Sequence, residues 1–492
     1  MSDRTPAEGA HAPPEFVKAL TLTDATMLVA GSMIGSGIFI VSADISRTLG
    51  SPGWLLIAWV LTGVITVLGA LAFGELAAMY PRAGGMYTFL RESMGPLMGF
   101  LYGWTLFVVI QTGTIAAVAV GFGKFLGVLF PSVTAERWMF AVDFKSGATT
   151  LEFGLSWQRV AALVSIWVLT WVNLRGVKEG KWVQTVLTFL KTASLAALVL
   201  LALTIGRNAD AMAANFGPGK LFAGTPDFSA LFVVTFGSAM VGSLFSADSW
   251  HSPTFAAAEV QNPARNLPRA LLFGTVLVTL LYVLANVSYL MVLPIHGAAD
   301  GATVMARGID HATQDRVATA VMESIFGANG SLIMAVAILI STFGCNNGLI
   351  LSGARVYYAM ARDGLFFRRA GELSARGVPA YALVVQSVWT SLLCLTGSYN
   401  QLLDYVIFAA LLFYALTTVG LFLLRWQRPD EPRPYKALGY PVLPALYIVA
   451  AAGVAVTLLV ADKTRLQALG GLAIVLLGVP VYLLWRRGAQ AA

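Results

Sequence analysis

The chain has 492 residues, of which 57% are hydrophobic and 12% charged, and its mean hydropathy is +0.74. This composition excludes a soluble globular protein, and uniformly apolar rather than alternating segments exclude a membrane β-barrel. The net charge of +7 is not gathered in one basic domain, so no nucleic-acid partner is expected. We therefore predict an all-α membrane protein.

Apolar segments long enough to cross a hydrocarbon core of about 30 Å recur along the whole chain and predict 12 transmembrane helices. In chain order they are 26–49, 53–79, 96–129, 158–174, 183–205, 229–258, 268–294, 330–360, 380–396, 402–425, 441–461 and 466–485. With the N-terminus inside, the inner segments carry nearly twice as many Lys and Arg residues as the outer ones. The positive-inside rule then places both termini in the cytoplasm, and we expect the protein to lie in the plasma (inner) membrane.

The first span is interrupted near its middle by the stretch from Ala30 to Phe39. Three glycines and two serines lie within seven residues there, and each glycine costs a helix interior about 1 kcal/mol relative to alanine. Unwound backbone survives in a membrane only where protein or a water-filled cavity satisfies its amides. Free N–H groups at such a break suit a carboxylate. The alternative is that these small residues only let neighbouring helices pack closely.

Lys191 lies alone in the apolar fifth span. A cation at this depth costs several kcal/mol unless it is paired or faces a cavity, and Lys191 is too far from either end to snorkel easily. We predict that it faces the bundle interior and donates to backbone carbonyls freed where the first span unwinds. A misplaced span boundary, with Lys191 at a membrane interface, is the alternative.

The sixth span contains a second interruption, from Gly242 to Pro253. Pro253 lacks an N–H group and clashes with the preceding turn, and polar residues crowd the same stretch. Because spans one and six are five apart, a five-helix repeat must re-enter from the opposite face and gives an inverted repeat. Paired interruptions of this kind point to the central site of a transporter. A proline kink with packing serines is the alternative.

Several side chains of the second interruption are open to more than one interpretation. Asp248 suits a substrate ammonium, an aqueous path or the N-cap of the following half-helix. His251 suits titration near neutral pH or a plain interhelical hydrogen bond. Phe245 and Trp250 suit either closure over a ligand or ordinary aromatic packing.

Polar residues elsewhere have simpler predicted partners. In the eighth span, the stretch from Ser341 to Gly348 is small and polar, which suits contact with Lys191 or interhelical hydrogen bonding without a transport role. Glu75 and Glu259 lie near cytoplasmic span ends, where Arg82 and Arg265 respectively are the expected ion-pair partners.

The sequence offers no enzyme chemistry. No span carries an HExxH pattern, a Ser/His/Asp set or a carboxylate pair at a plausible depth. We therefore expect a non-enzyme without catalytic residues, cofactor or metal site. Cys345 and Cys394 both fall inside apolar segments, so they imply no disulfide framework.

The chain resembles amino-acid transporters of the amino acid–polyamine–organocation superfamily, most closely the L-type branch and its bacterial relatives, over roughly residues 20–460. The motifs that carry the resemblance are Gly35-Ser36-Gly37-Ile38-Phe39 with Gly50-Ser51-Pro52-Gly53, Gly74-Glu75-Leu76 followed by Gly84-Gly85, Glu259 with Asn262-Pro263 and Arg265-Asn266-Leu267-Pro268, Phe343-Gly344 with Asn347-Gly348, and Arg433-Pro434.

This resemblance implies the leucine-transporter-type fold, a 5+5 inverted repeat with discontinuous helices 1 and 6 and alternating access. The implied organisation is a cytoplasmic tail (1–20), a first repeat (21–206), a second repeat (229–425), helices 11 and 12 (441–486) and a second tail (487–492).

The resemblance also implies roles for individual residues. The amides of Ile34, Gly35, Ser36 and Gly37, with the Ser36 hydroxyl, would hold the substrate carboxylate. The carbonyls of Met33, Phe245 and the Asp248 position would receive its ammonium group beside Ser246, and Phe245 and Trp250 would act as gates. Lys191 matches the lysine that sodium-independent members place where sodium-coupled relatives hold a structural sodium. The implied coupling residues are Lys191, Ser341, Asn347 and His251.

The chain departs from the L-type pattern at three places. Asp248 stands where that pattern has glycine, and His251 stands where asparagine is common. The loop at 130–157 has no cysteine, so no disulfide-linked accessory subunit is expected.

These observations predict a secondary active transporter of neutral L-amino acids, independent of sodium and driven by exchange or by proton coupling. Its partners are the amino acid, the lipid bilayer and, in the coupled case, a proton. Asp248 makes a cationic amino acid or a polyamine the alternative substrate. An amino-acid sensor without transport is the alternative from another class.

Overall fold

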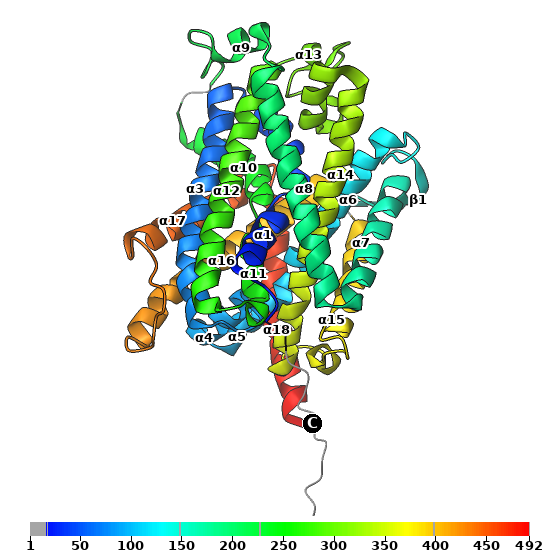
Figure 1. Cartoon of the computed structure of the whole chain (residues 1–492). Coiled ribbons are helices and arrows are strands. Elements are labelled where there is room, and N and C mark those ends of the chain that lie inside the picture. Colours follow the sequence, from blue (N-terminus) through cyan, green and yellow to red (C-terminus); the bar gives the residue numbers. More distant parts are fainter. Residues whose placement is uncertain (1–15, 17, 147–148, 226–227, 397–398, 492) are drawn as a thin grey trace, which may run out of the picture.

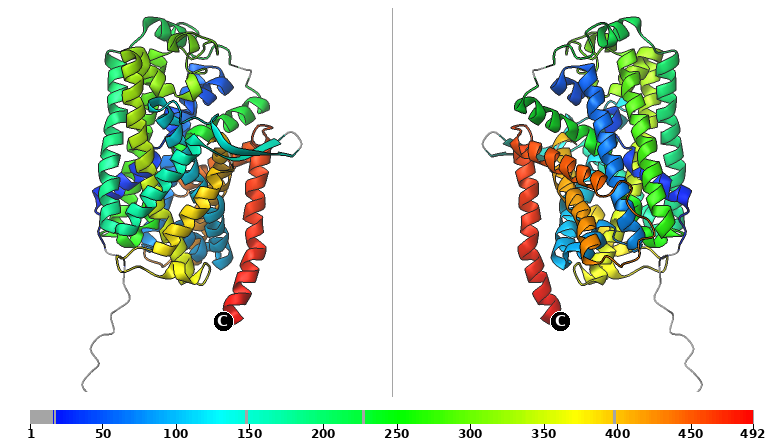
Figure 2. Two further views of the ribbon diagram at one scale, coloured as in Figure 1. Left: turned by 90° about the vertical axis from the view of Figure 1, so that its right-hand side faces the viewer. Right: turned by 90° about the vertical axis from the view of Figure 1, so that its left-hand side faces the viewer.

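The computed structural model describes residues 16, 18–146, 149–225, 228–396 and 399–491. Its helices run side by side in one bundle, with α9 and α13 at one end and the C-terminal end of α18 at the other (Figure 1). α18 runs along the side of the bundle against α5 and α16 (Figure 2).

Most predicted spans coincide with one continuous helical segment. Within the described residues, eight such segments are long and apolar enough to cross a membrane. They are α3 (Pro52–Met79), α5 with η2 and α6 (Pro96–Thr105, Leu106–Ile110, Gln111–Leu129), α8 (Val177–Thr204), α12 (Pro263–Val292), α14 (Val317–Arg362), α16 (Tyr399–Gln427), α17 (Val442–Val460) and α18 (Arg465–Ala491). The other predicted continuous spans coincide with α7 (Trp157–Arg175) and α15 (Ala380–Cys394), and short connecting helices are α4 (Met86–Met94), α9 (Ala209–Phe216), α13 (Val304–Arg307), η4 (Thr313–Asp315) and η5 (Arg368–Gly371).

Both interruptions predicted from the sequence are present. The first span consists of α1 (Leu22–Met33), η1 (Gly37–Phe39) and α2 (Ser42–Leu49). The sixth consists of α10 (Ala230–Ser246), α11 (Ser252–Phe255) and η3 (Ala257–Glu259). α1 packs against α8, α12 and α14, while η1 packs against α10. The two broken segments therefore meet in the middle of the bundle.

Backbone contacts tie the far ends of the two broken segments together. The Leu20 amide donates to the Glu259 carbonyl at 2.9 Å, and the Gln261 amide donates to the Leu20 carbonyl at 2.8 Å. Directly after this bridge, α1 begins with a capping box in which Thr21 and Asp24 each accept from the other's backbone amide. Residues 1–15 and 17 of the predicted N-terminal tail lie outside the described residues.

The motif Gly50-Ser51-Pro52-Gly53 forms the sharp turn between α2 and α3. Gly50 has φ of 65°, a conformation that glycine adopts without steric cost. The Ser51 hydroxyl accepts from the Trp54 amide at 3.3 Å and caps α3, and Pro52 occupies the first helical turn. Gly50, Ser51 and Pro52 thus each have a local structural reason.

Two features differ from the sequence-based expectation. The stretch read as a loop at 130–157 contains an antiparallel hairpin, β1 (Trp138–Ser146) paired with β2 (Thr149–Ser156), so strands accompany the predicted all-α fold. α14, which corresponds to the predicted eighth span, begins at Val317 rather than at 330 and bends at Gly327, where φ is 62°. The helix beyond this glycine corresponds to the predicted span.

Candidate functional site

The unwound end of α1 is held by side chains from three other helices. A helix C-terminus leaves its last carbonyls without intrahelical donors, and in a membrane these must be satisfied by protein. Each carbonyl from Gly31 to Gly35 accepts such a hydrogen bond: Gly31 from Lys191, Ser32 from Cys345 at 3.0 Å, Met33 from Tyr282 at 3.0 Å, Ile34 from Lys191 at 2.8 Å and from Ser341 at 3.2 Å, and Gly35 from Ser341 at 3.2 Å.

Lys191, on α8, lies where the sequence predicts. Its side chain is fully buried, and its Nζ donates to the carbonyls of Gly31 and Ile34 and lies 3.5 Å from the carbonyl of Ser341. An ammonium group has three N–H donors, and these three carbonyls use all of them. The positive charge also lies at the negative end of the α1 dipole, which stabilises it. The predicted contact is confirmed, while a role in coupling stays a prediction.

Two amides of the unwound segment lack a hydrogen-bond partner within the described residues. Gly35 and Gly37 have no acceptor for their amide hydrogens in the part of the chain that the structure describes. A Cβ at Gly37 would lie 2.1 Å from Ser246 Oγ, so only glycine permits this approach of α10. The Ile34 amide, by contrast, donates to the Ala30 carbonyl at 2.9 Å and ends α1. The prediction that the Ile34 amide binds substrate is therefore wrong, because the last helical turn uses it.

The sequence interpretation missed Tyr282, on α12, which contacts both breaks. Its hydroxyl lies 3.0 Å from the Met33 carbonyl at the end of α1 and 3.0 Å from the Ser246 carbonyl at the end of α10. A phenol has one proton, so it donates to one of these carbonyls at a time. Asn286 and Tyr289 follow on the same face of α12 and contact Ser42 and Ile38 respectively. The spacing of these polar residues at i, i+4 and i+7 was the available signal.

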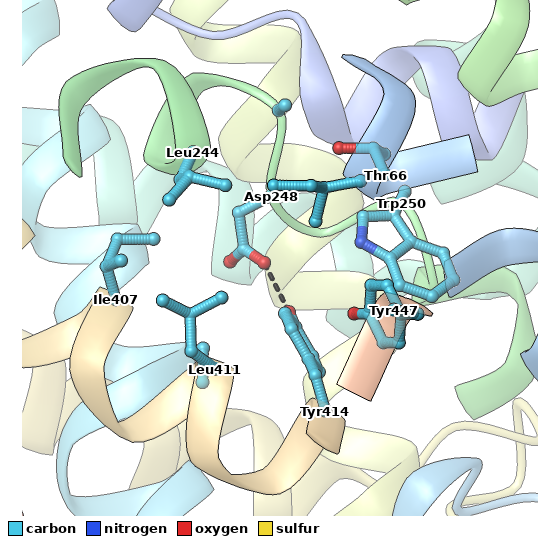
Figure 3. Close-up of a pocket in the computed structure, with 11 residues that line it drawn as sticks. Thr66, Leu244, Asp248, Trp250, Ile407, Leu411, Tyr414 and Tyr447 are labelled. Carbon is cyan, nitrogen blue, oxygen red and sulfur yellow. Dashed lines mark hydrogen bonds between the residues drawn. The ribbon is translucent and has the colours of Figure 1, made fainter. Parts of the chain in front are cut away.

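At the second break, Asp248, Trp250 and His251 face α16 instead of α1. Figure 3 shows the Asp248 carboxylate pointing toward the Tyr414 hydroxyl, which donates to it. The same hydroxyl lies 3.3 Å from His251 Nδ1. Because α11 has no side-chain cap, the capping interpretation of Asp248 is wrong: the carboxylate turns to Tyr414. Tyr414 was not predicted, since one tyrosine in an apolar span carries no sequence signal.

Asp248 and Trp250 line a small buried cavity between α3, α16 and α17. Its volume is about 20 Å³, which is room for about one water molecule. The lining residues are Ile65, Thr66, Leu244, Ala247, Asp248, Trp250, Ile407, Ala410, Leu411, Tyr414 and Tyr447. Of the predicted substrate-binding residues, only Asp248 is among them.

The two predicted gates differ in position. Trp250 is buried and packs its ring at 4.8 Å from Phe73, so its surroundings are those of a packed aromatic residue. Phe245 lies in the last turn of α10, and its carbonyl accepts from the Asp248 amide at 3.1 Å. Their gating roles stay predictions.

The polar stretch of α14 divides between two networks. Ser341 contacts the unwound segment and Lys191, whereas Asn347 bonds to Asn173 at 2.9 Å and to Gln184 at 3.0 Å. Six residues along a helix amount to about 9 Å, so both side chains cannot reach one ammonium group. The expected contact with Lys191 is therefore right for Ser341 and wrong for Asn347.

Both predicted ion-pair partners of the buried glutamates are wrong. Glu75 pairs with Arg425 and Arg433, and its Oε2 accepts from the Ala437 amide at 2.7 Å. Glu259 pairs with Arg355 at 2.8 Å, where both side chains are 1% exposed. In each case the partner is remote in sequence, because a buried carboxylate needs a cation that packing brings beside it.

The described residues contain no group of three or more His, Cys, Asp or Glu side chains that would hold a metal ion. Cys345 and Cys394 are both free and buried.

Comparison with known proteins gives a consistent result. Residues 20–479 match the amino acid permease family. The large neutral amino acids transporter small subunit 2 of Homo sapiens is 30% identical over 474 residues, which cover 95% of this chain and 80% of that protein. The b(0,+)-type amino acid transporter 1 of Oryctolagus cuniculus is 28% identical over 424 residues, covering 85% of this chain and 78% of that protein. The chain therefore belongs to the amino acid permease family of membrane transport proteins.

Proposed function

We propose that this protein is a sodium-independent transporter of neutral L-amino acids that works by alternating access, through exchange or proton coupling. The observation that carries the proposal is the unwound, buried segment after α1, where the Gly35 and Gly37 amides lack acceptors within the described residues and Gly37 lies against Ser246 of the second break. A carboxylate can accept hydrogen bonds from two such amides without any cationic side chain.

Carbonyl groups on the two breaks suit the ammonium end of the substrate. Met33 and Ser246 share the single Tyr282 proton, so one of their carbonyls lacks this donor at any moment. The Phe245 carbonyl already accepts from the amides of Ala247 and Asp248, which leaves the Met33 and Ser246 carbonyls as the oxygens for the ammonium group. An ammonium group supplies three donors and would satisfy these oxygens together. The α-amino acid would thus be bound through backbone groups at both ends.

The proposal of sodium independence rests on the position of the Lys191 ammonium group. Its ammonium group lies among the carbonyl oxygens of Gly31, Ile34 and Ser341. Oxygen atoms of this kind are the ligands that a hard cation would use. The fixed positive charge of the lysine takes that place, so a second cation would be repelled.

The wider arrangement belongs to the same proposal. The 12 spans would form two inverted five-helix repeats, 21–206 and 229–425, followed by 441–486, with tails at 1–20 and 487–492. Both termini would be cytoplasmic, the membrane would be the plasma (inner) membrane, and no accessory subunit would be disulfide-linked. The name of the human relative refers to large neutral amino acids, and this supports a neutral substrate.

A cationic substrate is the second candidate, and one observation favours it. Asp248 is a buried carboxylate whose hydrogen-bond partners within the described residues are the neutral side chains of Tyr414 and Ser249. A cationic side chain or a polyamine would compensate its charge.

Counterflow tests the proposal. Purified protein in liposomes preloaded with unlabelled alanine, leucine, lysine or putrescine is given the same compound, labelled, outside. We expect preloaded leucine or alanine to accelerate uptake, with no change when choline replaces sodium. Flux of lysine or putrescine alone would establish the second candidate. Substrate-dependent thermal stabilisation without any flux would identify a sensor instead.

A further inference from the structure

Two charged side chains lie buried at the centre of the bundle, and they differ in how they are compensated. All three N–H groups of Lys191 meet backbone carbonyls. Asp248 is 5% exposed and has no Lys or Arg partner in the described part of the chain; the Tyr414 hydroxyl donates to it, and Ser249 Oγ lies 3.4 Å away. A buried carboxylate with only neutral partners costs several kcal/mol as an anion.

The titratable groups that face Asp248 from neighbouring elements of the described chain are tyrosine, cysteine and histidine side chains. They are Tyr414 on α16, Tyr447 on α17, Tyr102 on α5, Cys345 on α14 and His251 in the same break. α3 contributes only Ile65 and Thr66 to the cavity. Asp248 is therefore the one carboxylate among these groups, and none of them is a Lys or Arg that would supply a countercharge.

The cavity beside Asp248 limits what can supply that charge. Its volume of about 20 Å³ holds about one water molecule. Its remaining lining is mostly aliphatic and aromatic, with too few oxygen ligands for a dehydrated metal cation. A proton needs no further space and no additional ligands.

We propose that Asp248 is the proton-binding residue through which this transporter couples amino-acid movement to the proton gradient. The inference rests on the proposed transport function and moves the predicted coupling site from Lys191 to Asp248. One proton from water joins a carboxylate oxygen when the cavity is open to one side of the membrane. The same proton leaves to water when the cavity opens to the other side.

Tyr414 is a positioning residue for this proton. With Asp248 ionised, the phenol donates to the carboxylate. With Asp248 protonated, the acid can donate to the phenol oxygen, and the phenol can turn to His251 Nδ1 at 3.3 Å. In either arrangement the carboxyl group and the phenol remain hydrogen-bonded to each other. Protonation or deprotonation of Asp248 therefore requires rotation of the Tyr414 hydroxyl rather than rearrangement of helices.

The test compares Asp248→Asn with wild type in liposomes under an inside-alkaline pH gradient. We expect wild type to accumulate substrate above equilibrium, and Asp248→Asn to lose accumulation at least about 10-fold while counterflow continues, since a tenfold effect corresponds to one pH unit of driving force. Asp248→Glu should restore accumulation with a shifted pH profile, and Tyr414→Phe should shift that profile as well. Asp462→Asn, at an exposed ion pair, serves as the control and should match wild type.

Failure of this inference differs from failure of the proposed function. Absence of counterflow in wild type would contradict transport itself. Counterflow without pH-driven accumulation in wild type, accumulation that follows sodium, or full accumulation by Asp248→Asn would overturn the proton site. Infrared difference spectra between acid and alkaline pH provide a second readout that needs no flux. The C=O band of a buried carboxylic acid should be present in wild type and absent from Asp248→Asn, and its persistence in that variant would also overturn the proposal.

Discussion

The two broken helices solve the same structural problem in opposite ways. At the first break, donors from α8, α12 and α14 lie within hydrogen-bond distance of every carbonyl from Gly31 to Gly35, with the Tyr282 proton shared between Met33 and the second break, and all three N–H groups of Lys191 meet carbonyls. At the second break, Asp248 has no Lys or Arg partner among the described residues and lies beside a cavity of about 20 Å³. The first break therefore has the properties of a rigid binding surface, and the second has those of a part whose charge and volume can change.

This difference has an energetic origin. A buried carbonyl without a donor costs about 1–3 kcal/mol of folding free energy, and each hydrogen bond at the first break avoids that cost. Several hydrogen bonds therefore stabilise the first break together. Fewer fixed partners hold the second break, and Ser249 within it has a φ of 64°, which a residue with a side chain rarely adopts. We expect variants at the first break to reduce stability and binding together. Variants at Asp248 should change coupling with little change in stability.

The largest effect is expected for Lys191→Met, which keeps much of the side-chain volume and removes the ammonium group. The Gly31 carbonyl then loses its donor and the Ile34 carbonyl keeps only Ser341. At about 1.5–3 kcal/mol for each hydrogen bond to a charged group, the loss of stability is about 3–6 kcal/mol. Thermal unfolding in detergent and counterflow measure the effect, and both should fall sharply. Lys463→Met, at an exposed ion pair with Asp44, should cost no more than about 1 kcal/mol. Normal uptake by Lys191→Met would show that the first break does not depend on this cation.

Gly37→Ala should follow, with a strong effect on binding. The new Cβ would meet Ser246 at 2.1 Å from Oγ, 2.9 Å from Cβ and 3.1 Å from Cα, so α10 must move away from η1. Substrate affinity, measured by thermal shift or scintillation proximity, should fall at least about 10-fold, which is about 1.4 kcal/mol. Adding Ser246→Gly removes the two nearest atoms and should restore part of the affinity.

The matched control for Gly37→Ala is Gly453→Ala on α17, where an added Cβ meets nothing within 4 Å. It should leave affinity unchanged and stabilise the helix by up to about 1 kcal/mol. Equal affinities of Gly37→Ala and wild type would argue against a substrate site between the two breaks.

Tyr282→Phe tests whether the two breaks are linked through α12. Loss of the shared hydroxyl leaves the Met33 and Ser246 carbonyls without this donor, at a cost of about 1–3 kcal/mol. We expect transport to slow by about 10-fold, measured as the initial rate of counterflow. Tyr289→Phe, whose hydroxyl lies 3.3 Å from the Ile38 carbonyl, should have a smaller effect because it contacts only one break. Equal effects of Tyr282→Phe and Tyr289→Phe on the initial rate would contradict a special role for Tyr282 in linking the two breaks.

Local chemistry made much of the site predictable. Glycines and serines in the first span and Pro253 in the sixth mark the two interruptions, because these residues weaken or prevent helices wherever they occur. Lys191 is identified by the cost of a lone cation in lipid, and that cost also implies its carbonyl partners. Such arguments need no knowledge of which helices are neighbours.

What could not be predicted depends on packing between remote segments. Tyr414 is an amphipathic aromatic residue in an apolar span, and nothing local distinguishes it from a packing tyrosine. Tyr282 is marked only by its spacing to Asn286 and Tyr289, and that spacing does not reveal which helix ends it contacts. Glu75 and Glu259 find arginines far along the chain instead of the nearby Arg82 and Arg265. The hairpin at 138–156 was missed because its alternating pattern, with Phe140 and Val142 between less hydrophobic residues, is short.

The smallest predicted effect separates two residues of α14 that the sequence placed in one group. Ser341 Oγ lies 3.2 Å from both the Ile34 and the Gly35 carbonyls, so Ser341→Ala should cost about 0.5–1.5 kcal/mol and weaken substrate binding by a few-fold. Asn347→Ala should destabilise the contacts among α7, α8 and α14 and leave affinity as in wild type, because its partners are Asn173, Gly180 and Gln184. Isothermal titration with the transported amino acid, together with thermal unfolding, measures both variants. If Asn347→Ala weakens binding as Ser341→Ala does, the first break extends along α14 as one unit, and its rigidity comes from the whole helix rather than from the donors that touch it.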